Sequence, residues 1–148
     1  MGDRFSDALK DAIRAKDTHR ISTLRLIIAA IKDREIALRS EDRSLSDQDV
    51  LQILQKMVRQ RQESAETYEQ ASRLELAEQE RKEIDIIEAF LPRQMDEAEV
   101  AEACQSAIAT VGAEGLKDMG KVMAQLKEQH TGEMDFKLAS AKVKDLLK

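Results

Sequence analysis

The stretch EIDIIEAFLPRQMD, residues 83–96, carries the only proline of the chain and marks the change from one helix to the next. Ile84, Ile87 and Phe90 follow the spacing of one helical face. Pro92 then ends that helix, because the proline ring disfavours α-helical geometry at the residue before it. Asp96 follows with the spacing of a capping box, since a glutamate stands three positions later. We therefore expect a domain boundary here, with one domain over residues 1–92 and another over residues 93–148.

Upstream of this boundary the apolar residues recur every three or four positions, which predicts an N-terminal bundle of about four helices. Asp17 and Ser46 precede two of these helices and have side chains that favour N-cap positions. The expected helices cover about 3–15, 17–38, 46–71 and 74–91. Their predicted common core consists of Leu24, Ile28, Ile31, Leu54, Met57, Ile84, Ile87 and Leu91.

Downstream of the boundary we expect a smaller C-terminal subdomain of three helices. The first begins after Asp96 and ends at Gly112, because glycine is the usual residue past a helix end. The second begins at Leu116 and ends near Gly132. Asp135 has the position of an N-cap for the third.

The composition favours an all-α fold. Hydrophobic residues make up 42% of the chain and charged residues 36%, whereas aromatic residues make up only 3%. Five glycines and one proline are few for a protein rich in turns and strands. We therefore predict an all-α chain with an aliphatic core.

The cysteine content and the hydropathy pattern concern location. Cys104 is the single cysteine, so no intramolecular disulfide can form, which fits a reducing compartment. The N-terminal segment has no apolar run typical of a secretory signal. No stretch approaches the roughly twenty apolar residues that span a bilayer. We therefore expect a cytoplasmic protein without a membrane partner.

Residues that commonly carry catalysis or bind metals are sparse. His19 and His130 lie far apart, and neither has a second histidine or a cysteine at ligand spacing. Cys104 lies on an apolar stripe, which is typical of a small core residue. No phosphate-binding glycine loop, nucleophile elbow or dinucleotide motif occurs. We predict no catalytic residue, no metal and no cofactor.

Some polar residues occur where the apolar spacing calls for hydrophobic ones. A guanidinium group on such a face needs a carboxylate or carbonyl partner, unless it lines a groove that binds an anion. The candidates for a buried ion-pair network or an anion site are Arg25, Arg61, Tyr68, Arg73 and Glu80. The acids expected to be available as partners are Glu35, Glu63, Glu69 and Glu80.

Together these segments resemble the GatB/YqeY family over nearly the whole chain. The most distinctive feature is the leucine–proline end of the fourth helix, followed by the GKVM segment and a Gly-x-x-Asp cap. The matching pieces are LRLIIAAIKDREI (24–36), VLQILQKMVRQRQESAETY (50–68), ASRLELAEQE (71–80), EIDIIEAFLPRQM (83–95), DMGKVMAQL (118–126) and TGEMD (131–135).

The resemblance implies a role near tRNA. A related module forms the C-terminal tail of the B subunit of the glutamine-dependent amidotransferase that converts misacylated Glu-tRNA or Asp-tRNA. There the tail is understood to help hold the tRNA, while amide transfer occurs in other domains. The resemblance therefore links this chain to carbon–nitrogen ligase activity with glutamine as amido-N-donor. These residues supply no site for that reaction, so we expect a non-catalytic accessory module.

If tRNA contact carries over, it should involve RNA phosphates and the lysines of the last two helices. The chain has a net charge of −5, yet residues 116–148 contain seven lysines and five acids. The candidate RNA-binding residues are Lys117, Lys121, Lys127, Lys137, Lys142, Lys144 and Lys148.

The expected partner is tRNA or a tRNA-processing complex, and the acidic net charge argues against DNA. The alternative is a protein-interaction or regulatory bundle that uses its acidic N-terminal helices and makes no RNA contact. The sequence predicts no particular oligomeric state.

Overall fold

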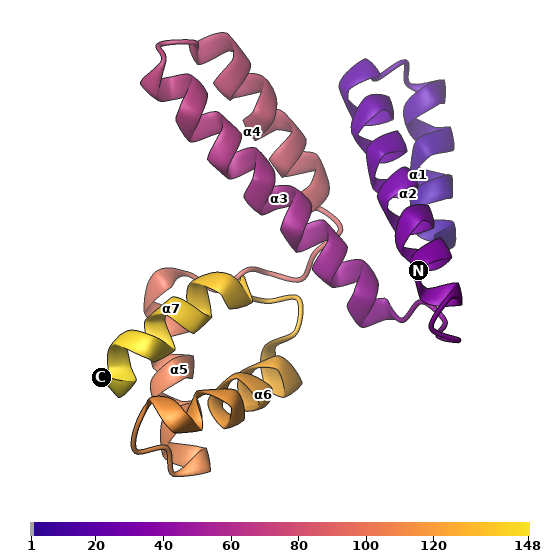
Figure 1. The fold of residues 1–148 in the computed structure, drawn as a ribbon. Coiled ribbons are helices and arrows are strands. Elements are labelled where there is room, and N and C mark those ends of the chain that lie inside the picture. Colours follow the sequence, from indigo (N-terminus) through magenta and orange to yellow (C-terminus); the bar gives the residue numbers. More distant parts are fainter. Residues whose placement is uncertain (1) are drawn as a thin grey trace. The chain divides into compact units, whose positions relative to one another are not determined.

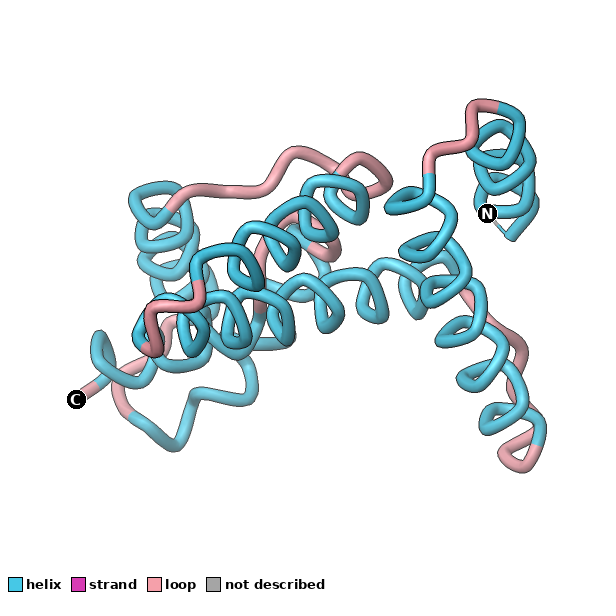
Figure 2. Tube along the Cα trace, turned by 90° about the horizontal axis from the view of Figure 1, so that it is seen from above, coloured by secondary structure: helices cyan, strands magenta, loops and turns pink. Residues whose placement is uncertain are grey.

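The computed structural model describes residues 2–148, and its regular structure is entirely helical (Figures 1 and 2). No strand occurs in this range, so the prediction of an all-α fold is confirmed. The helices are α1 (Gly2–Arg14), α2 (Thr18–Arg39), α3 (Asp47–Gln70), α4 (Leu74–Glu88), α5 (Glu97–Val111), the short 3-10 helix η1 (Leu116–Asp118), α6 (Met119–His130) and α7 (Phe136–Leu147).

Four helices begin at the N-cap residues predicted from the sequence. The Asp96 carboxylate accepts a hydrogen bond from the Glu99 backbone N–H at 2.8 Å, and the Glu99 side chain accepts one from the Asp96 backbone N–H at 3.2 Å. This reciprocal capping box satisfies two of the N–H groups that have no partner within the helix. The other observed caps are Asp17, Ser46 and Asp135.

The chain forms two compact units, Met1–Leu91 and Pro92–Lys148. We refer to them as unit 1 and unit 2. Unit 1 contains two helical hairpins, in which α1 packs against α2 and α3 packs against α4 (Figure 1). Unit 2 contains α5, α6 and α7, each of which packs against the other two.

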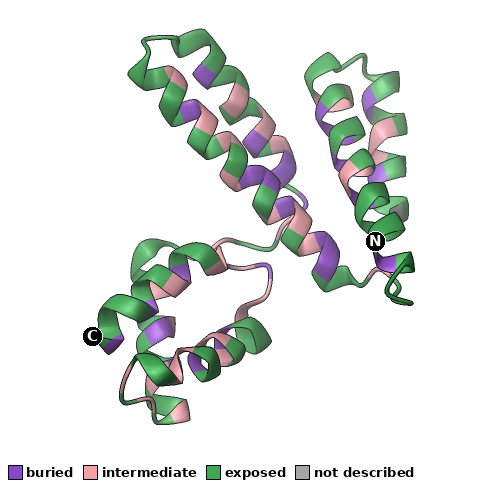
Figure 3. Cartoon of the chain, in the orientation of Figure 1, coloured by how far each residue is buried: buried purple, intermediate pink, exposed green. Residues whose placement is uncertain are grey.

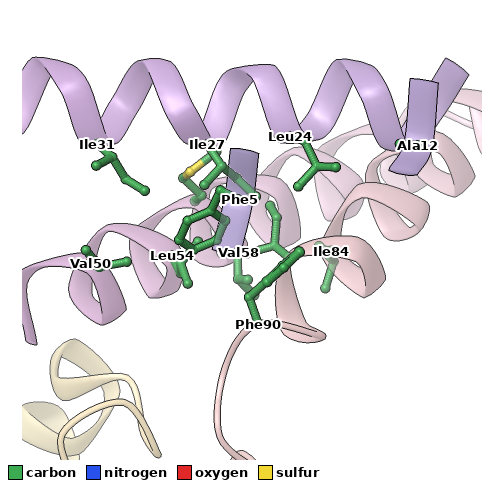
Figure 4. Packing of buried hydrophobic residues seen from close by; sticks show 12 residues of the cluster. Phe5, Ala12, Leu24, Ile27, Ile31, Val50, Leu54, Val58, Ile84 and Phe90 are labelled. Atoms are coloured by element: carbon green, nitrogen blue, oxygen red, sulfur yellow. The ribbon is translucent and has the colours of Figure 1, made fainter. Parts of the chain in front are cut away.

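One apolar cluster joins all four helices of unit 1 (Figure 4). Six of the eight predicted core residues are buried in it, whereas Ile28 and Leu91 are half-buried and pack against it. Two phenylalanines from opposite ends of the unit also belong to the cluster, with the ring centroids of Phe5 and Phe90 5.0 Å apart. The buried members are Phe5, Ala12, Leu24, Ile27, Ile31, Val50, Leu54, Met57, Val58, Ile84, Ile87 and Phe90.

Unit 2 has its own apolar cluster, and the segment after Pro92 is attached to it. The Met95 backbone N–H donates to the Glu133 carbonyl at 2.8 Å, and the Gln94 side-chain amide donates to the Gly132 carbonyl at 2.6 Å. The buried members of the cluster are Cys104, Ala107, Val122, Leu126, Met134, Ala139, Val143 and Leu147.

Unit 2 differs from the prediction at one helix start. Leu116 was expected to begin the sixth helix, but it lies in η1 and its side chain is 48% exposed. The preceding helix ends at Gly112, whose φ of 65° is a left-handed conformation that glycine adopts without a steric penalty.

Candidate functional site

A half-buried ion pair joins α3 to α4 inside unit 1. The Arg61 Nε donates to the Glu83 Oε2 at 3.0 Å, and the Arg61 Nη1 donates to the Met57 carbonyl at 3.1 Å. The two charged side chains are only 13% and 16% exposed. Arg61 therefore has both a carboxylate and a carbonyl partner, as a guanidinium group on a packed face requires.

A second carboxylate lies beside this pair. Burial raises the pKa of Glu80, the nearby charge of Glu83 raises it further, and Arg61 opposes both effects. The Arg61 guanidinium group thus pairs with Glu83 and also lowers the pKa of Glu80, one turn earlier in α4. Arg61 and Glu80, two of the predicted polar residues, do come together, and the acid that binds Arg61 is Glu83 rather than one of the four expected partners.

Two of the predicted arginines lie outside this cluster. Arg25 is exposed, because α2 turns Leu24, Ile27 and Ile31 into the core and the residue after Leu24 points to another side. Arg73 is exposed at the turn between α3 and α4, where its backbone N–H donates to the Tyr68 carbonyl at 2.8 Å. The prediction that both arginines belong to a buried network is therefore wrong.

Tyr68 is half-buried and borders an open recess on α3. The recess has a volume of about 420 Å³ and is lined by Gln60, Glu63, Ser64, Thr67 and Tyr68. Its charged lining group is a carboxylate, and none of the three predicted arginines lines it. This recess therefore lacks the cations that an anion site needs.

Two ion pairs outside the Arg61 cluster join residues that are not neighbours on one helix. Arg81 pairs with Glu69 across the α3–α4 hairpin. Arg93 binds the Glu99 carboxylate through both terminal nitrogens, at 3.0 and 2.6 Å, which lowers the pKa of Glu99. Neither pair has the spacing of neighbours on one helix, so a search by helical periodicity could not find them.

The candidate lysines of unit 2 are all exposed. Lys137 and Lys144 are seven residues apart, so they lie along one side of α7, and Lys148 follows Leu147, the last residue of the helix. The Lys148 Nζ lies 3.9 Å from the Asp145 Oδ1, so these two side chains form an ion pair. The remaining candidates are Lys117 in η1, Lys121 and Lys127 in α6, and Lys142 in α7.

Charge in unit 2 is divided between helices that pack together. α5 and its cap residue contain Asp96, Glu97, Glu99 and Glu102 and no lysine or arginine. From Phe136 to Lys148 the chain has four lysines and one acid, Asp145. α5 packs against α7, so unit 2 has an acidic helix next to a basic one.

Metal ligands and a reactive thiol are two other features that could form a site. No group of three or more histidine, cysteine, aspartate or glutamate side chains in this part of the chain is arranged to hold a metal ion. Cys104 is buried, and burial raises the pKa of its thiol, which disfavours the reactive thiolate. No helix within residues 2–148 is both long and apolar enough to cross a membrane.

Three relatives illustrate what the chain is similar to. It is 33% identical over 84 residues to an uncharacterized protein of Schizosaccharomyces pombe, a match that covers 57% of this chain and 66% of that protein. It is 26% identical over 148 residues to "Altered inheritance of mitochondria protein 41, mitochondrial" of Pyrenophora tritici-repentis, with 97% of this chain and 79% of that protein covered. The protein of the same name in Clavispora lusitaniae is 37% identical over 83 residues.

The Clavispora match covers 56% of this chain and 46% of that protein, so the chain spans less than half of that relative's length. The names of these relatives also bear on location. Two of the three relatives are named as mitochondrial proteins, which contradicts the cytoplasmic location expected from the sequence. That expectation rested on one cysteine and the lack of a secretory signal, and both features are compatible with other reducing compartments. The model of the YqeY-like protein family matches residues 2–147, and the chain therefore belongs to this family.

Proposed function

We propose that this chain is a non-catalytic accessory module that binds tRNA, or a tRNA-processing complex, through the lysines of unit 2. The observation that carries the proposal is the pair Lys137 and Lys144 on one exposed side of α7, with the exposed Lys148 directly after the end of the helix. Lys137 and Lys144 are about 10 Å apart along the helix axis, since each residue adds about 1.5 Å. Several phosphates of an RNA strand can meet cations along that length.

The chemistry of this surface favours contact with phosphates rather than with bases. Lysine is a compact cation without fixed hydrogen-bond geometry, so it positions a phosphate backbone and carries no sequence information. Phe136, the aromatic residue nearest to these lysines in sequence, is half-buried and packs against the core of unit 2. Base stacking on an exposed ring is therefore not expected, and RNA shape would determine selectivity.

The acidic α5 supports an oriented complex. Because α5 lies against α7, a polyanion approaching unit 2 is attracted to one side and repelled from the other. A net charge of −5 over the chain is consistent with modest affinity, since only a local patch attracts phosphate.

The test measures binding of total tRNA by filter retention over a range of salt concentrations. If three phosphates are contacted, the logarithm of the association constant should fall with the logarithm of salt concentration at a slope of roughly −2 to −3. The variant Lys137→Glu, Lys144→Glu, Lys148→Glu should bind at least about tenfold more weakly at low salt.

The matched control reverses three exposed lysines of unit 1, Lys10→Glu, Lys56→Glu and Lys82→Glu. This variant has the same net charge as the first, so a general effect of charge would weaken both equally. An equal loss in both variants would contradict the proposal. So would the lack of any complex at about 20 mM salt, where screening is weak. The protein-interaction alternative would then be preferred.

A further inference from the structure

α2 has large apolar residues on a side that does not pack against the rest of unit 1. Leu24, Ile27 and Ile31 are buried in the cluster of unit 1, whereas Leu26 and Ile36 are 46% and 52% exposed. Exposed positions occur along the whole helix (Figure 3). A surface helix normally has a polar side opposite its buried side. The exposed side of α2 does carry charged residues such as Arg25, Lys32 and Arg39, but it also carries these two large apolar residues. The exposed side of α2 therefore has the character of a contact surface.

Three exposed apolar residues and one aspartate lie on one line along the helix. Leu26, Ala29, Asp33 and Ile36 are separated by three, four and three residues, and all four are exposed. Alternating steps of three and four place residues on the seam along which two helices pack. We call these four residues the α2 seam.

A row of cations follows one flank of the α2 seam. Arg25, Lys32 and Arg39 are spaced by seven residues, so they lie in one line about 10 Å apart along the helix. All three are exposed, and none forms an ion pair within the described part of the chain. On the other flank Thr23 is buried, Ala30 is half-buried and Ala37 is exposed, so the cations lie on one flank only.

We propose that the α2 seam is a docking surface for an amphipathic helix of another protein, with carboxylates along the flank that faces Arg25, Lys32 and Arg39. The apolar seam supplies the contact area. The charged flank selects the partner, as flanking charges do in coiled coils. This surface belongs to unit 1 and does not depend on the lysines of unit 2.

Asp33 argues against a polyanionic ligand. Its carboxylate lies in the middle of the seam, between Ala29 and Ile36, where it would repel RNA phosphates or an anionic lipid surface. A partner helix can accommodate a single carboxylate by placing one basic side chain opposite it.

The same charges argue against a second copy of this chain. Packing two α2 seams antiparallel would bring the two rows of cations against each other. Packing them parallel would bring one Asp33 against the other and would leave the cations opposite Thr23 and Ala30. Both arrangements place like charges together or leave charges without partners, so the chemistry points to a different polypeptide.

The experiment uses the full chain and two synthetic helical peptides of about three heptads. Both have leucine and isoleucine at the seam positions, and one has glutamate on both flanks whereas the other has lysine. Like charges on the flanks disfavour self-pairing of each peptide, so each remains available. Binding is measured by fluorescence anisotropy of the labelled peptide.

The glutamate peptide should bind at least about tenfold more tightly than the lysine peptide. The variant Arg25→Glu, Lys32→Glu, Arg39→Glu should invert this preference. The variant Leu26→Asp, Ile36→Asp should lose both peptides, and the Lys10, Lys56 and Lys82 reversal should bind like the original chain. Circular dichroism of each variant checks that the helices remain.

Several outcomes would overturn the proposal. Equal binding of the two peptides, or an unchanged preference after reversal of the row, would mean that the charges do not select the partner. A chain that dimerises, and becomes monomeric with Leu26→Asp, would mean that a second copy occupies the seam. Loss of tRNA binding on reversal of the row, with the peptides unaffected, would identify a phosphate-contacting surface instead.

Discussion

The guanidinium carbon of Arg4 lies 4.9 Å from the centroid of the Phe90 ring, which joins the start of α1 to the end of α4. The same guanidinium group donates to the Phe90 and Ala89 carbonyls, each at 3.4 Å. The last carbonyls of a helix have no partner within it, and a cation near them interacts favourably with the helix dipole. Arg4 therefore acts as a cap from a distant part of the chain.

Replacing this cap should destabilise unit 1. Arg4→Ala is expected to lower the free energy of unfolding by about 1 kcal/mol, through the lost cation–π contact and the lost charge near the helix end. Urea unfolding can be followed by the fluorescence of Tyr68, the only tyrosine in a chain without tryptophan. Arg14→Ala is the control, because Arg14 is also in α1 but is highly exposed in its ion pair with Asp11. Equal losses for the two variants would contradict a specific cap.

Removing one partner of the Arg61–Glu83 pair should lower the free energy of unfolding strongly, whereas replacing both with apolar residues should lower it little. Arg61→Ala leaves the Glu83 carboxylate half-buried next to Glu80, so the free energy of unfolding should fall by on the order of 3 kcal/mol. The double replacement Arg61→Met, Glu83→Leu removes both charges and keeps the volume, and it should recover most of that loss. A double variant as unstable as Arg61→Ala would show that packing, rather than charge, dominates at this position.

Glu80 should make the stability of unit 1 depend on pH. The folded-state pKa of Glu80 is raised above the ordinary value of 4.5, mainly because burial disfavours its charged form. The folded state therefore holds the proton more tightly than the unfolded state. The contribution of Glu80 to the free energy of unfolding is largest below pH 4.5. It decreases as the pH rises from the pKa of the unfolded state through the higher pKa of the folded state.

The variant Glu80→Gln should remove this decrease. It should be more stable than the original chain at pH 7 and close to it at pH 4, as measured by urea unfolding across that range. Glu66→Gln, at an exposed position of α3, should leave the dependence of the free energy of unfolding on pH unchanged. A Glu80→Gln variant that is less stable at pH 7 would indicate that attraction to Arg61 outweighs the effect of burial.

The turn between α3 and α4 contains a conformation that should limit stability. Ser72 has a φ of 60°, in the left-handed region, and its backbone N–H donates to the Glu69 carbonyl at 3.0 Å. Glycine adopts this conformation without the penalty from Cβ. Ser72→Gly should therefore raise the free energy of unfolding by about 0.5–1 kcal/mol, whereas Ser72→Val, with a branched Cβ, should lower it. Urea midpoints that move in the reverse order would contradict this account.

The helix boundaries could be predicted because their causes are local. Asp17, Ser46, Asp96 and Asp135 cap the helices that follow them, and a side-chain oxygen satisfies the exposed N–H groups whatever the rest of the chain does. The aliphatic repeats also identified half of the buried residues of the unit 1 core, since an apolar stripe at helical spacing must pack against another element.

The candidate site could be predicted only in part, because burial and ion pairing depend on distant neighbours. Arg25 and Arg61 both stand among apolar residues in the sequence, yet Arg61 is half-buried against Glu83 and Arg25 is exposed. The difference lies in which side of each helix meets the others. α3 packs its Arg61 side against α4, whereas α2 uses the side of Leu24 and Ile27 and leaves Arg25 outside.

By itself the sequence determined which residues cap four of the helices, that the regular structure of the described residues is helical, and half of the buried residues of the unit 1 core. Only the tertiary structure decided which polar side chains pair, that Arg4 caps α4, and which side of α2 stays uncovered. The physical reason is range. Capping and helical periodicity act over a few residues, whereas the partner of a charged group such as Arg61 is the residue that packing brings within about 3 Å of it.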